Sequence, residues 1–152
     1  MGIIDVIPTD MTLEKTIYND NNSLRSPRYT YNLFNKLGNK HCALCNCEIP
    51  ELIQGAHIWP VADIKRAPAM SFEQRLACAT DGDNGLWLCE NHHKLFDEHF
   101  VTFNQNGHVQ FRTGIERRHA IYMHDITTNM VLPDNVMTER FVEYLWRRQH
   151  AG

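Results

Sequence analysis

Apolar residues recur at helical spacing in the segment RYTYNLFNKLG. Tyr29, Leu33 and Leu37 are each four residues apart, so they share one face of a helix. Gly38 follows them, and glycine is a common residue at the end of a helix. The pattern therefore predicts a helix over residues 28–38.

Apolar and polar residues alternate in the segment FVTFNQNGHVQFR, residues 100–112. Asn106 and Gly107 lie at its centre, and this dipeptide is typical of a tight turn between two strands. The alternation predicts a β-hairpin. Weaker patterns predict a strand near 52–58, a loop over 61–82, a turn at 81–85, and helices near 71–77, 90–99, 116–124 and 138–149.

The first 27 residues show neither the helical spacing of apolar residues nor the alternation of apolar and polar residues. They contain Pro8, Pro27 and a polar run from Asn19 to Ser23, which predict an irregular arm or linker. We therefore expect an N-terminal arm at 1–27, a core at 28–112 and a C-terminal helical extension at 113–152.

The composition narrows the class of protein. The chain has 152 residues, enough for one compact domain. It contains no apolar run near the roughly 20 residues that span a membrane, and no secretory signal pattern, so we expect a cytoplasmic protein with no membrane partner. The net charge is −3, so any phosphate binding must depend on local basic patches.

Five cysteines need an explanation in a reducing compartment. Cys42 and Cys45 form a Cys-x-x-Cys pair, and Cys89 and His92 form a Cys-x-x-His pair. Two such pairs suit a tetrahedral zinc ion, and four protein ligands leave no open position, which indicates a structural zinc. Cys47 is an alternative ligand.

Two other interpretations of the cysteines remain. They could be small buried residues, as we expect for Cys78, which has no visible partner. Cys42 and Cys45 could form a redox pair, although no strand–CxxC–helix pattern surrounds them.

Three short segments then occur in a specific order. They are AHIWP at 56–60, NGLWL at 84–88 and HKLFD at 93–97. Their order and spacing, together with the zinc-type pairs, resemble the HNH endonuclease family over roughly residues 41–105. The resemblance implies an α+β fold. Its centre would be a small ββα-metal (HNH, His-Me finger) core held by a structural zinc and flanked by helices.

The resemblance also implies roles for individual residues. His57 would be the general base, and an imidazole suits this task near neutral pH. Asn84 would brace the loop that carries the base. His93 and Asp97 are four residues apart on the expected helix, so they can share a catalytic divalent ion, Mg²⁺, Mn²⁺ or another. Many HNH enzymes have a further metal ligand just before the base, where this chain has Ala56.

Basic residues outside the three segments are candidate phosphate contacts, and a solvated helix face is the alternative interpretation. They are Arg112, Arg117, Arg118, Arg147 and Arg148, with Arg25 and Arg28 as further candidates. We expect Trp59, Trp87 and Phe96 to pack in the core.

The resemblance implies a metal-dependent endonuclease that cuts double-stranded DNA, in restriction or defence. The first alternative is a zinc-containing nucleic-acid-binding module without catalysis, which would not need His57, Asn84 and His93 together. A zinc hydrolase of another class is the second, although no His-Glu-x-x-His pattern is present. A homodimer, and a longer polypeptide that carries a recognition domain, both stay open.

Overall fold

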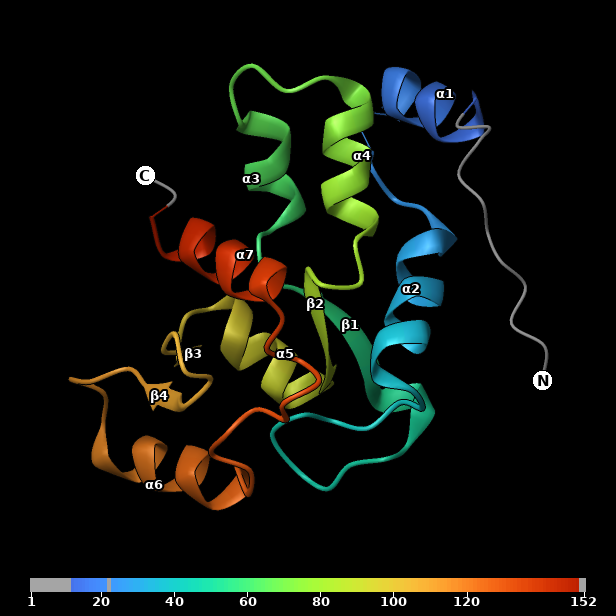
Figure 1. The fold of residues 1–152 in the computed structure, drawn as a ribbon. Coiled ribbons are helices and arrows are strands. Elements are labelled where there is room, and N and C mark those ends of the chain that lie inside the picture. The colour runs from blue at the N-terminus through green and yellow to red at the C-terminus, as the bar shows by residue number, and fades with distance from the viewer. Residues whose placement is uncertain (1–11, 22, 151–152) are drawn as a thin grey trace.

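The computed structural model describes residues 12–21 and 23–150 (Figure 1). In this part of the chain, helices surround two small antiparallel sheets, which confirms the expected α+β class. The elements in chain order are α1 (Thr12–Asn21), α2 (Pro27–Leu37), a 3-10 turn (Pro50–Leu52), β1 (Ile53–His57), α3 (Val61–Arg66), α4 (Phe72–Thr80), β2 (Gly85–Cys89), α5 (Glu90–Asp97), β3 (Val101–Phe103), β4 (Val109–Phe111), α6 (Arg117–Ile126) and α7 (Glu139–His150).

The two strands β1 and β2 form the central ribbon. They pair antiparallel, with Ile53 opposite Cys89 and His57 opposite Gly85. Helix α5 begins directly after β2 and contacts both strands. In Figure 1 the ribbon lies between α2 on one side and α5 on the other. This ββα arrangement places His57 at one end of the ribbon and Cys89 at the other.

Two glycines allow α2 to pack closely on the ribbon. A Cβ atom at Gly85 would lie 2.0 Å from the hydroxyl oxygen of Tyr29, and one at Gly55 would lie 2.6 Å from Cδ1 of Leu33. Any larger residue would push the helix away, because real Cβ contacts are not that short. The glycine of the NGLWL segment is therefore a packing requirement for Tyr29.

The C-terminal helix α7 belongs to the same core as the ribbon. Phe141 and Leu145 of α7 are fully buried, as is Phe96 of α5. Trp59 and Trp87 are 5% and 2% exposed, which confirms that these aromatic residues pack in the core. The hairpin expected at 100–112 is present as β3 and β4, and Gly107 in its turn has φ +81°.

The prediction of an irregular arm at 1–27 is wrong for residues 12–21, because these residues form α1. Long-range contacts hold this helix. The buried carboxylate of Glu14 lies 2.8 Å from the Arg28 guanidinium, and the Tyr18 ring lies 5.2 Å from the Phe72 ring of α4. Such partners are invisible in a local pattern.

Residues 1–11 and Asn22 lie outside the described residues, as do 151–152 of the C-terminal extension.

The loop expected over 61–82 is also more helical than its pattern indicates. Residues Val61–Arg66 form α3, and α4 runs from Phe72 to Thr80. The Ser71 hydroxyl accepts from the Gln74 amide, and the Gln74 side chain accepts from the Ser71 amide. This capping box stabilises the start of α4.

No helix among the described residues is long and apolar enough to cross a membrane.

Candidate active site and metal centre

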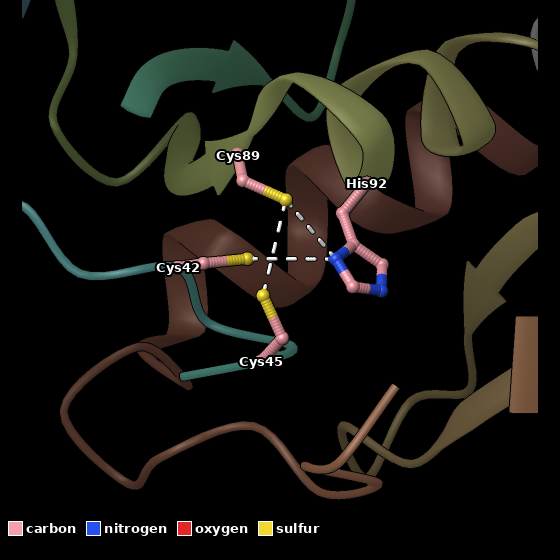
Figure 2. A group of neighbouring side chains, drawn as sticks. All are labelled: Cys42, Cys45, Cys89 and His92. Carbon is pink, nitrogen blue, oxygen red and sulfur yellow. Dashed lines mark hydrogen bonds between the residues drawn. The ribbon is translucent and has the colours of Figure 1, made fainter. Parts of the chain in front are cut away.

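Four side chains that could hold a metal ion converge at one end of the ribbon (Figure 2). The sulfur atoms of Cys42, Cys45 and Cys89 and Nδ1 of His92 all lie within 4.8 Å of one another. The Cys45 and Cys89 sulfurs are 3.9 Å apart, and the Cys89 sulfur is 3.3 Å from His92 Nδ1. A tetrahedral zinc separates its sulfur and nitrogen ligands by roughly 3.5–3.8 Å. The donor set therefore fits a zinc ion and can hold one.

Local structure brings the two ligand pairs together. The Cys42 amide donates to the Cys47 carbonyl at 2.9 Å, which folds the first pair into a tight turn. Cys89 ends β2, and His92 lies one turn into α5. Cys47, the alternative ligand, contributes its backbone to this turn and lies outside the four-residue group.

A residue far along the chain fixes the orientation of His92. Nε2 of His92 lies 2.9 Å from the Thr127 hydroxyl, which itself donates to the Met123 carbonyl at 2.7 Å. Since that hydroxyl proton is already used, its oxygen accepts from His92 Nε2–H. Nδ1 then keeps its lone pair, and this is the nitrogen that faces the cysteines.

Burial raises the pKa of the Cys45 thiol to about 12, and the neighbouring Cys42 and Cys89 add to the rise. The Cys45 thiol therefore stays protonated unless a cation enters the group. Zinc binding requires thiolates, so it must release protons here.

His57 lies at the end of β1 with its ring held on two sides. Nε2 lies 2.8 Å from the Ala79 carbonyl, so it carries the proton and donates. The Tyr29 ring stacks on the imidazole, with centroids 3.9 Å apart and planes within 12°. Nδ1 is left with its lone pair. Burial lowers the pKa of His57 and the His93 charge adds to this, while Ala79 and Asp97 oppose it.

Asn84 is fully buried and ties together the segments that follow β1 and precede β2. Its side-chain oxygen accepts from the Trp59 amide at 2.7 Å, and its side-chain nitrogen donates to the carbonyls of Trp59 and Cys78 at 3.2 and 3.0 Å. Its own carbonyl accepts from the Tyr29 hydroxyl at 3.0 Å. These bonds anchor the chain just after His57.

His93 points away from the cysteine group although it is the next residue after His92. Its Nε2 lies 3.3 Å from Asp97 Oδ2, and its Nδ1 lies 2.6 Å from Gln54 Oε1. An octahedral divalent ion separates neighbouring ligand atoms by roughly 3 Å. Nε2 and the Asp97 carboxylate are therefore spaced to share an ion, with Gln54 accepting from the other ring nitrogen.

Sequence reasoning missed three residues that touch the candidate ligands and base, namely Tyr29, Gln54 and Thr127. The position of Gln54 in the sequence could have indicated its role. It lies two residues before Ala56, so both side chains leave the same face of β1. Tyr29 and Thr127 gave no such indication, because one is an apolar-face residue of a helix and the other follows α6 by one residue.

The candidate phosphate-binding arginines have different surroundings. Arg148 is 9% exposed, and its guanidinium donates to the carbonyls of Ile58 and Phe96 at 3.2 and 2.7 Å. It is occupied inside the protein, so the phosphate contact expected for it is not retained. Arg112, Arg117, Arg118 and Arg147 are exposed. Arg118 pairs with Glu116, and Arg147 pairs with Glu143 and covers the Trp59 ring.

Comparison with known protein families shows which family has a similar sequence. Residues 42–104 match the family model described as HNH endonuclease. This segment, which is less than half of the chain, is similar to the HNH endonuclease family. The match confirms the resemblance carried by the three short segments, and similarity to the HNH family points to nuclease activity. A search of curated proteins finds no match to the chain.

The HNH segment holds the four zinc-type ligands together with His57, Asn84, His93 and Asp97. Several of their supporting contacts come from outside it. Tyr29 precedes the segment, and Thr127 and Arg148 follow it. Both flanking regions therefore complete the site.

Proposed function

We propose that this protein is a divalent-metal-dependent endonuclease that hydrolyses DNA, with Nδ1 of His57 as the general base. The observation that carries the proposal is the hydrogen bond between His57 Nε2 and the Ala79 carbonyl, which leaves Nδ1 as the nitrogen that can take a proton. The HNH match supports the reaction class, since HNH nucleases act on DNA.

The catalytic ion would be held by His93 Nε2 and Asp97 Oδ2, 3.3 Å apart. A divalent ion bound there, Mg²⁺ or Mn²⁺, supplies positive charge to the phosphoryl oxygens and to the departing 3′-oxygen. Gln54 Oε1 accepts from Nδ1–H of His93 at 2.6 Å and so keeps Nε2 free for the ion. Gln54 is thus a positioning residue for the proposed ligand His93.

In the proposed reaction His57 activates a water molecule. As the water oxygen bonds to phosphorus, its proton moves to His57 Nδ1, and the bond between phosphorus and the 3′-oxygen breaks. The 3′-oxygen takes a proton from solvent, which gives 5′-phosphate and 3′-hydroxyl ends. Asn84 holds the chain after His57 through Trp59, so the imidazole stays in place through the cycle.

The ion at Cys42, Cys45, Cys89 and His92 is proposed to be a structural zinc. All four ligand positions come from the protein, which leaves none for a substrate. We propose double-stranded DNA as the substrate and restriction or defence as the setting. Cutting both strands needs either two active sites, which a homodimer would supply, or sequential nicking by one site.

A plasmid-nicking assay tests this proposal. Purified protein with Mg²⁺ or Mn²⁺ should relax supercoiled DNA, and His57→Ala should lower the rate by about 10²–10⁴-fold. His119→Ala, an exposed histidine on α6, is the matched control and should keep full activity. Intact plasmid with every metal and DNA tried, or unchanged nicking by His57→Ala, would refute the proposal.

A further inference from the structure

A cavity of about 770 Å³ lies beside His57. Its walls come from the segment between α1 and α2, the first turn of α2, and α3, while Gly55 and His57 of β1 contribute one side. Volumes of about 300–1,000 Å³ are typical of sites that accept small ligands. The space is thus large enough for a nucleotide unit.

The chemistry of the cavity wall suits a phosphodiester backbone. Two cationic residues, Arg25 and Lys65, line it together with the hydroxyl residues Ser23 and Thr30, and no carboxylate residue is among the described lining residues. Behind this wall the carboxylate of Glu14 is ion-paired with Arg28 at 2.8 Å, which offsets its charge. In a chain with a net charge of −3, such a wall is a local basic patch.

His57 connects this cavity to the proposed metal ligands. The imidazole lines the cavity, and the charges of His93 and Asp97 are near enough to shift its pKa. The β1 strand that carries His57 lies between α2 and α5 (Figure 1). Because His57 lines the cavity, a DNA strand whose phosphate lies at His57 would continue into the cavity.

We propose that this cavity seats the DNA backbone next to the phosphate that is cut, with Arg25 and Lys65 as phosphate contacts. The inference rests on the proposed nuclease function. It assigns a binding role to residues 23–30, which precede the segment that matches the HNH family. Phosphate contacts of this kind position DNA and do not read its sequence.

The first test measures DNA binding without cleavage. Fluorescence anisotropy of a labelled duplex, in buffer without added divalent metal, gives the affinity at several salt concentrations. Arg25→Ala and Lys65→Ala should each weaken binding and lower the slope of log K against log[salt] by about 0.9. Arg140→Ala removes the same charge from α7, where the guanidinium pairs with Asp81 and Asp83, and should leave the slope unchanged. Equal effects at all three positions, or no effect at Arg25 and Lys65, would overturn the proposal.

A second pair of variants tests the space itself. Thr30→Trp fills the cavity from an exposed position on α2 without changing charge, and should weaken DNA binding by at least about tenfold. Asn35→Trp, exposed on the same helix and not part of this cavity, should bind like the wild type. Zinc content and melting temperature report that each variant is folded. Wild-type binding by Thr30→Trp would overturn the proposal.

These outcomes are separable from those of the nicking assay. A protein that nicks plasmid but shows unchanged binding in the Arg25, Lys65 and Thr30 variants retains its nuclease function and loses only the proposed cavity site. A protein that binds DNA through the cavity but never nicks it supports the cavity and refutes the nuclease.

Discussion

His92 and His93 are adjacent in the chain, yet their side chains enter different surroundings. The His92 ring is 1% exposed among the cysteine sulfurs and Thr127, while His93 contacts Gln54 and Asp97. Neighbouring side chains on a helix point roughly 100° apart, so α5 can serve two metal sites at once. The two histidines should therefore fail in different ways when replaced.

We expect His92→Ala to lose zinc and unfold, because a structural ligand is gone. We expect His93→Ala to keep zinc and its melting temperature but lose nicking activity by at least about 100-fold, because the catalytic ion loses a ligand. Zinc content, thermal unfolding and plasmid nicking measure the three properties. A folded but inactive His92→Ala, or an active His93→Ala, would mean that the roles are assigned wrongly.

The pH dependence of nicking should report the protonation of His57. Burial lowers its pKa below the ordinary value of 6.5. A general base works only when it is neutral, so activity should rise with pH through this lowered pKa and level off above it. We expect the midpoint of the acidic limb below pH 6.5 when single-turnover rates are measured at saturating metal. A midpoint at or above 6.5 would contradict the buried environment of His57.

At the scale of elements, α7 holds the two parts of the candidate active site together. Its Arg148 donates to the carbonyls of Ile58, next to His57, and Phe96, next to Asp97. The guanidinium also lies 3.8 Å from the centre of the Phe96 ring. This C-terminal helix therefore couples β1 to α5.

Replacing Arg148 with alanine should destabilise the protein by roughly 2–4 kcal/mol, because two buried carbonyls lose their donor. Arg147→Ala is the matched control on the same helix. Its side chain is 45% exposed, and its loss should cost at most about 1 kcal/mol. Urea unfolding measures both. Similar losses of stability for the two variants would show that Arg148 has no special coupling role.

At the scale of the whole molecule, the cysteine–histidine group joins distant segments. It links the turn after α2, the end of β2 and the start of α5, and through Thr127 it reaches the end of α6. Zinc binding in small domains contributes about 10–16 kcal/mol, which is comparable with the whole stability of a domain. Removing the ion should therefore affect every element.

We expect a strong chelator to lower the melting temperature sharply and to expose the core. Zinc loss should become easier as pH falls, because protons compete with zinc for the cysteine ligands, and burial raises the pKa of the Cys45 thiol to about 12. A colorimetric zinc indicator at several pH values, with thermal unfolding in parallel, measures both effects. Unchanged melting after complete zinc removal would contradict a structural role.

Much of the candidate site could be predicted from sequence because its ligands follow local rules. A Cys-x-x-Cys turn and a Cys-x-x-His pair bring their donors together over a few residues, and all four donors do meet. The separation of His92 from His93 follows from helical geometry in the same way. The helix at 28–38 and the hairpin at 100–112 were also predictable from periodicity alone.

Other features depend on partners that are far apart in the chain. Tyr29 stacks on His57, Thr127 orients His92, and Arg148 reaches Ile58 across 90 positions. A pattern of residue types cannot reveal these contacts, because each is made by packing two elements that no local rule connects.

The sequence by itself thus determined the four residues of the zinc-type group and the α+β class, since spacing and residue chemistry are enough for these, and it nominated His57 as the base. Only the tertiary structure decided which nitrogen of His57 and of His92 keeps its lone pair. It also decided that Arg148 is an internal donor, that residues 12–21 are helical, and that a cavity opens beside His57. Tautomers, burial and cavities are properties of surroundings, and surroundings exist only once the chain has folded.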